Sequence, residues 1–156
     1  MKKGFTLIEL MVVIAIVAVL AGLTLGYLTD SRKKGGDTGV KSNLQTVRAL
    51  SEIFYLDNAN SYLPAGGSTF SVASCPSYNA SGTNMFARNK TIADAIAEAG
   101  NRGDGTACAN SGNFWAVAVG LNLNPGTSWC IDNQGSAKVV SAAPTASINP
   151  TTFQCN

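Results

Sequence analysis

The chain has 156 residues, 46% of them hydrophobic, and it carries 11 Lys and Arg against 9 Asp and Glu. This length suits one compact domain plus one apolar segment and excludes a two-domain enzyme. The small net charge gives no field for gathering nucleic acid, and a chain without histidine excludes Ser-His-Asp and Cys-His catalysis. We therefore predict a protein that is not an enzyme and has no cofactor, metal site or nucleic-acid partner.

The N-terminus is a basic leader, residues 1–4, followed by an apolar run from Phe5 to Leu28 in which Glu9 is the only charged residue. A helix of this length measures about 36 Å, which is enough to cross the ~30 Å hydrocarbon core of a bilayer. A carboxylate in such a segment costs roughly 2.5–3.5 kcal/mol and marks a function. Because we expect no polar partner for Glu9 in its own helix, we predict a cation on a neighbouring copy.

Two simpler interpretations of this segment stay open. The run could be a secretory signal peptide that is cleaved after Ala21, or Glu9 could merely reach the headgroup region from near the helix start. The charges alone do not decide how the segment is oriented in the membrane. Lys2 and Lys3 favour a cytoplasmic N-terminus, whereas Arg32-Lys33-Lys34 after the run oppose it. The cysteines decide for a cytoplasmic N-terminus, because they need the oxidising side of the membrane.

The sequence Lys3-Gly-Phe-Thr-Leu-Ile-Glu-Leu10, with the apolar run after it, resembles the class III signal and N-terminal helix of bacterial type IV pilins and type II secretion pseudopilins. The match is strong over residues 1–28 and architectural beyond them. The resemblance implies that a prepilin peptidase cuts between Gly4 and Phe5 and that the new Phe5 amine is methylated. It also implies that Glu9 pairs with the amine of a neighbouring subunit during assembly at a pilus platform.

Glycines recur in the second half of the apolar run and in the residues that follow it. Gly22 and Gly26 have a spacing that allows close packing of helices in a membrane or in a filament core. Residues 30–39 hold three glycines within five positions, which is costly inside a helix, so we predict a solvated break there. This would depart from the family pattern of one long helix, and Asp37 or Thr38 would then cap a restarted helix.

Beyond the break we expect a small α+β domain. Apolar residues at helical spacing predict an amphipathic helix to about Asp57 that packs on a sheet; they are Val40, Leu44, Val47, Leu50 and Phe54. A long loop to about Lys90, a short helix over 91–99 and a mobile turn over 101–105 follow. Strands over 114–121, 128–132 and 137–141 then predict an antiparallel meander. The tail over 142–155 would drift unless tied down.

The four cysteines, Cys75, Cys108, Cys130 and Cys155, indicate two disulfides rather than a metal site. Sequence alone allows all three connectivities. We favour Cys75–Cys108, which closes the loop around the short helix, and Cys130–Cys155, which fastens the tail to the second strand. Such a disulfide-bounded C-terminal region also resembles that of many pilins.

Together these features predict a leader (1–4), a transmembrane and filament-core helix (5–29), a glycine-rich break (30–39) and a soluble pilin-like head (40–156). The expected function is that of a structural subunit of a type IV pilus-like filament, a homo-oligomer serving adhesion, motility or DNA uptake. The precursor would sit in the cytoplasmic membrane and the assembled filament on the cell surface. The alternatives are a type II secretion pseudopilin and a secreted or anchored binding domain.

Overall fold

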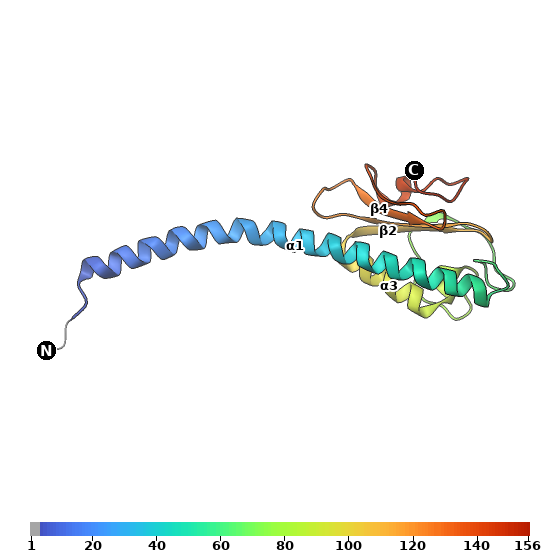
Figure 1. Cartoon of the computed structure of the whole chain (residues 1–156), viewed down its shortest axis with the longest axis horizontal. Helices are drawn as coiled ribbons and strands as arrows, with labels where there is room; N and C mark the ends of the chain where they lie inside the picture. The colour runs from blue at the N-terminus through green and yellow to red at the C-terminus, as the bar shows by residue number, and fades with distance from the viewer. Residues whose placement is uncertain (1–3) are drawn as a thin grey trace.

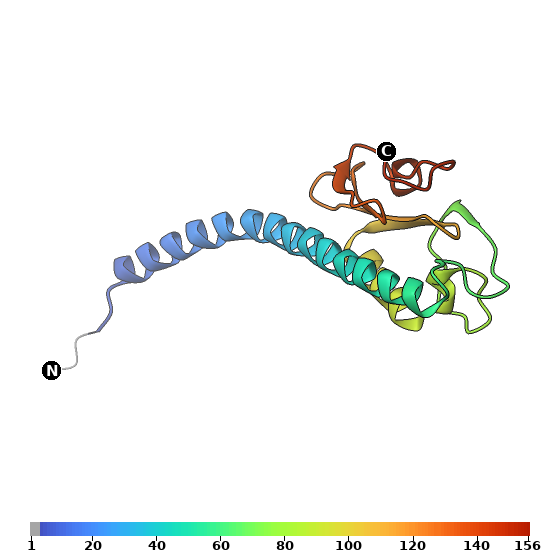
Figure 2. The ribbon, with the colours of Figure 1, turned by 45° about the vertical axis from the view of Figure 1, so that its right-hand side comes forward.

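The computed structural model describes residues 4–156, except the side-chain surroundings of residues 24–26. Its dominant element is α1 (Leu7–Asp57), a helix of 51 residues. Figures 1 and 2 show the N-terminal half of α1 projecting away from the molecule, while its C-terminal half lies along α3 and the sheet. The chain is therefore a rod with a globular head at one end, and the predicted α+β class is confirmed.

The C-terminal half of α1 packs into the head as its apolar spacing predicts. Val40, Leu44 and Val47 are fully buried, and Leu50 and Phe54 pack against the same core. Spacings of three and four residues place these side chains along one face of the helix. The amphipathic segment is confirmed, but it is not a separate helix.

The predicted break at 30–39 is wrong, because α1 continues through it. The glycines there make room for the end of α3 (Lys90–Arg102): a Cβ at Gly36 would lie 2.9 Å from the Arg102 carbonyl oxygen, and one at Gly39 would lie 2.6 Å from Arg102 Cδ. Asp37 does not cap a helix. Its carboxylate accepts the backbone N–H groups of Asn122, at 2.8 Å, and Leu123, at 3.2 Å. Tertiary contacts thus outweigh the low helix propensity of glycine.

Between α1 and the main strands the chain forms more structure than the predicted loop. It contains β1 (Phe70–Ala73) and α2 (Met85–Arg88), in which Met85 and Phe86 are fully buried. The side chain of Asn84 caps α2 by accepting the Ala87 N–H at 3.0 Å. Helix α3 covers the predicted 91–99 segment and runs on to Arg102. Elements of four residues are too short to show a periodic pattern, which is why the sequence did not indicate them.

The sheet has five antiparallel strands in the order β1-β2-β3-β4-β5. The predicted meander is confirmed as β3 (Trp115–Gly120), β4 (Ser128–Asp132) and β5 (Ala137–Val140). The turn predicted over 101–105 is wrong, because β2 (Asp104–Asn110) begins there and pairs along β3. Glycine, alanine and asparagine are poor strand formers, so β2 depends on its neighbours rather than on its own propensity.

Both faces of the sheet are covered. Trp115, Val117 and Val119 belong to the core beneath α1 and α3, while Ala116 and Ala118 face the opposite side, as their alternation predicts. That opposite face is covered by the tail, which forms the 3-10 helix η1 (Pro144–Ser147) and places Ile148 against the alanines. Figure 2 shows this tail folded back over the strands.

Two disulfides and one buried acid hold the tail and the loops in place. The structure joins Cys75 to Cys108 and Cys130 to Cys155, the pairs that the sequence analysis favours. Asp132 is fully buried. Its carboxylate accepts three backbone N–H groups: those of Gln134 at 3.0 Å, Ser136 at 2.9 Å and Cys155 at 3.0 Å.

Alanine substitutions at two neighbouring glycines of α1 should change the free energy of unfolding in opposite directions. Gly36→Ala should lower the free energy of unfolding by about 1–3 kcal/mol, because the new methyl group pushes against the Arg102 carbonyl. Gly35→Ala should raise it by up to about 1 kcal/mol, because a Cβ there meets nothing within 4 Å and alanine favours the helix. Urea unfolding in detergent, followed by tryptophan fluorescence, measures both. Shifts of the same sign would contradict the α1–α3 contact.

Asp132→Asn should lower the free energy of unfolding by about 1–3 kcal/mol, because the amide cannot accept all three N–H groups and leaves a buried donor unpaired. The same urea titration measures this loss. The exposed Asp57→Asn is the matched control, with an expected change within about 0.5 kcal/mol. Equal effects of the two substitutions would contradict the structural role of Asp132.

Candidate processing and assembly segment

The start of α1 is fixed by a reciprocal cap between Thr6 and Glu9. Thr6 is the N-cap residue, and its hydroxyl oxygen accepts the backbone N–H of Glu9 at 3.3 Å. In return, one carboxylate oxygen of Glu9 accepts the backbone N–H and the hydroxyl of Thr6, each at 2.8 Å. This arrangement satisfies backbone donors that the first turn of a helix leaves without partners.

The expectation that Glu9 has no polar partner in its own helix is therefore wrong. A carboxylate at the third helical position reaches back to the cap, a local geometry that the Thr6-x-x-Glu9 spacing already contains. These bonds bring no cation, however, so within the described residues the carboxylate has no ion-pair partner. Phe5, directly before the cap, is 87% exposed.

The projecting half of α1 presents apolar side chains on every side. Of the described residues, one helix is long and apolar enough to cross a membrane, and it is α1. Large side chains from Leu7 to Leu28 are exposed around it, with Ile8, Val12 and Val13 next to Glu9 forming a shallow apolar groove. Exposed apolar area of this extent is typical of a surface that lipid or another protein covers.

Gly22 is exposed in this half of α1. A Cβ at Gly22 would meet nothing within 4 Å in the single chain, so the position is open for a neighbour. The surroundings of Gly26 lie outside the described residues, and so do Lys2 and Lys3. Close packing of helices at Gly22 and Gly26 stays a prediction.

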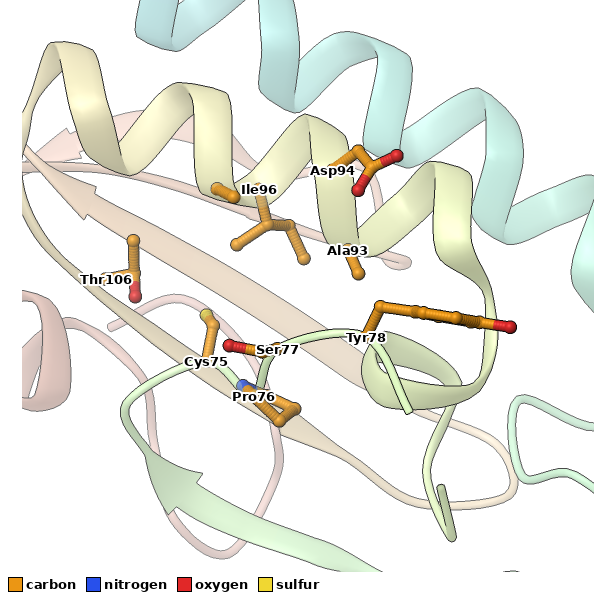
Figure 3. A pocket seen from close by; sticks show the side chains of 9 residues that line it. Cys75, Pro76, Ser77, Tyr78, Ala93, Asp94, Ile96 and Thr106 are labelled. Carbon is orange, nitrogen blue, oxygen red and sulfur yellow. The ribbon is translucent and has the colours of Figure 1, made fainter. Parts of the chain in front are cut away.

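A pocket of about 190 Å³ lies in the head between α3 and the loop after β1. Figure 3 shows Cys75, Pro76 and Ser77 along one side of it and residues of α3, among them Ala93 and Ile96, along the other. Cys75 forms a disulfide bond with Cys108, and Asp94 forms an exposed ion pair with Lys90 at 2.6 Å. Ser77 and Thr106 bring hydroxyl groups to this lining, but the structure shows Asp94 bonded to Lys90 and no hydrogen bond from either hydroxyl to it, whereas covalent catalysis requires a nucleophile paired with a base.

The shifted pKa values of the head have structural causes. Burial and the hydrogen bond from the Tyr62 hydroxyl to Glu52, at 2.8 Å, raise the pKa of Tyr62 to about 12. The hydrogen bond to Asp94 raises the pKa of the exposed Lys90. Glu98, the other acid on the outer side of α3, pairs with Arg102 at 2.7 Å. The two acids at positions 94 and 98 thus form a solvated, ion-paired face.

A family model matches the N-terminus of the chain. Residues 1–25 match the family described as "Prokaryotic N-terminal methylation motif". The chain is 47% identical over 60 residues to the type IV wide pilus major component PilA4 of Thermus thermophilus, covering 38% of this chain and 45% of that protein. It is 38% identical over 58 residues to the type II secretion system core protein G of Klebsiella pneumoniae, covering 37% and 41%.

The core protein G of Pectobacterium carotovorum is 35% identical over 57 residues, or 36% of each chain. The chain spans less than half the length of each of these relatives. No solved structure is significantly similar to it. The first 25 residues therefore carry the prokaryotic N-terminal methylation motif, and the resemblance to type IV pilins and type II secretion pseudopilins is confirmed in this part of the chain.

Proposed function

We propose that the chain is a structural subunit of a type IV pilus-like surface filament. The observation that carries this proposal is the combination of the methylation motif at residues 1–25 with an apolar helix that projects, uncovered, from a folded head. The motif implies processing between Gly4 and Phe5, and the uncovered helix supplies a surface for polymerisation. The role is structural and requires no catalysis by the subunit.

The projecting helix has two environments in this proposal. Its apolar side chains are covered first by lipid, in a precursor anchored in the cytoplasmic membrane, and later by the helices of other subunits in the filament core. The head stays outside in both states. Its two disulfides support this orientation, because they persist on the oxidising side of the membrane.

Glu9 sets the axial position of one subunit relative to the next. Among residues 4–156 of the single chain its carboxylate has no cationic partner, and cleavage after Gly4 would create a positively charged amine on Phe5, next to the Thr6 N–H that Glu9 already accepts. Glu9 can then pair with its own amine or with that of a neighbour. Pairing with a neighbour's amine takes place only on assembly. A subunit that is shifted along the filament axis brings its amine beside Glu9, and the ion pair neutralises both charges in the apolar layer.

The second candidate function is that of a type II secretion pseudopilin, which the similarity to the core protein G relatives favours. The higher identity to the pilus component, and the two disulfides of the head, favour the pilin. Electron microscopy of sheared surface fibres, with identification of their subunit, separates the two functions.

Mass spectrometry of the N-terminus tests the processing step. The mature protein isolated from its native membrane should begin at Phe5 and carry one added methyl group on the amine. Gly4→Trp should leave the unprocessed form, because a bulky residue replaces the small one at the cleaved bond. A mature protein that begins at Gly22 would instead show simple secretion and contradict the pilin assignment.

Replacement of Glu9 tests the assembly step. Glu9→Ala should leave the chain inserted in the membrane but reduce surface filaments at least tenfold, because an unpaired buried amine costs about 3–5 kcal/mol per subunit. Thr6→Ala is the matched control, because it removes the hydroxyl's two bonds of the reciprocal cap at a cost of about 1 kcal/mol and keeps the carboxylate. Electron microscopy and immunoblots of sheared fibres measure the filaments.

Normal filaments from the Glu9→Ala protein would refute the pairing. An equal loss in the Thr6→Ala protein would assign the effect to the helix cap instead.

A further inference from the structure

A basic cluster, Arg32, Lys33 and Lys34, follows the apolar run on the side of the membrane that the head occupies. Cations in that position oppose the expected orientation, since positive residues are normally retained in the cytoplasm. Filament assembly through Glu9 gives them no role. Their position in the structure, however, leaves them accessible to a partner other than the head or a neighbouring subunit.

The three side chains are exposed and free for an outside ligand. All three residues are exposed, and in the described part of the chain both side-chain ion pairs lie on α3 and leave the cluster out. Asp30 is the one acid in the segment between Leu28 and the head, so the segment keeps a positive charge. An anionic surface would therefore meet a group of donors whose segment keeps an excess of positive charge, three cations against the one acid Asp30.

The helix distributes the three cations around its axis. Consecutive residues on an α-helix are rotated by about 100°, so Arg32, Lys33 and Lys34 point in three different directions. Lys33 precedes the buried Val40 by two turns and thus lies on the side of α1 that faces the head. The other two flank that side. The cluster forms a partial collar that can contact ligands on the head-facing side of the helix and on both flanks of that side.

The continuity of α1 fixes the height of this collar. Leu28 ends the apolar run, and contact with the head begins at Gly36 and the buried Asp37. At ~1.5 Å per residue, the cluster lies about 6–9 Å beyond Leu28, which matches the headgroup layer of roughly 5–8 Å on each side of the hydrocarbon core. Because the predicted break does not exist, no hinge lets the cluster leave this layer.

We propose that the basic cluster binds the phosphate groups of anionic lipids in the outer leaflet of the cytoplasmic membrane. The inference rests on the proposed membrane-anchored precursor. The contacts hold the rod in one vertical position, with the base of the head at the lipid surface. They must be released when the subunit leaves the membrane, so the anionic lipid content sets how easily a subunit is extracted into the filament.

Lipid selectivity of the full chain tests this proposal. The chain is reconstituted in phosphatidylcholine vesicles that contain spin-labelled phosphatidylglycerol or spin-labelled phosphatidylcholine, and electron paramagnetic resonance measures the fraction of each lipid held at the protein. The wild-type chain should prefer phosphatidylglycerol by on the order of fivefold, the effect of about one cation at an anionic surface. The triple variant Arg32→Gln, Lys33→Gln, Lys34→Gln should show no preference.

The matched control is Arg88→Gln, Lys90→Gln, Lys138→Gln, which removes the same charge from exposed positions on the head and should keep the preference. Selectivity retained in the cluster variant, or lost equally in the control, would overturn the proposal. Stronger displacement by inorganic phosphate than by sodium chloride at equal ionic strength would assign the cluster to free phosphate and overturn it too. Flotation of each protein with the vesicles checks insertion separately, and a wild-type chain that does not float would refute the membrane anchor itself.

Discussion

The contact between α1 and the end of α3 determines the architecture of this protein. Gly36 and Gly39 let Arg102 approach the helix backbone, and Asp37 binds the loop after β3 through two backbone N–H groups. The contact stabilises a helix where its own residues disfavour one. It also connects the apolar rod to the head without a hinge. In the proposed membrane-anchored subunit, this contact would set the height of the head above the membrane and its alignment with the rod.

Sequence patterns identified the parts whose signal is local. The apolar run, the 3–4 spacing from Val40 and the alternation around Val117 each report on a single helix or strand, and all three are confirmed. Gly36 shows the limit of such patterns: glycine indicates a break locally, and only the approach of Arg102 shows that it permits packing. Strand β2 is similar, because its alanines are recruited by β3 rather than by their own propensity.

The functional segment was more predictable than the fold of the head, since a processing motif is recognised as linear sequence. The sequence missed one aspect of it, the bond between Glu9 and Thr6, although the Thr-x-x-Glu spacing of a capping box was visible. This local bond changes the chemistry of the site. The bond holds Glu9 in a defined position in the single chain, so the proposed pairing with a neighbour's amine would cost less conformational freedom.

The arrangement of the two disulfides has a mechanical consequence for the proposed filament. A fibre under tension transmits force from subunit to subunit through the packed α1 rods, and both cross-links lie outside that path, in the sheet, its loops and the tail. Reduction would therefore loosen the outer shell of the fibre without cutting it. In the proposed filament the apolar rods would therefore carry the tension, whereas the cross-links would keep the exposed heads folded.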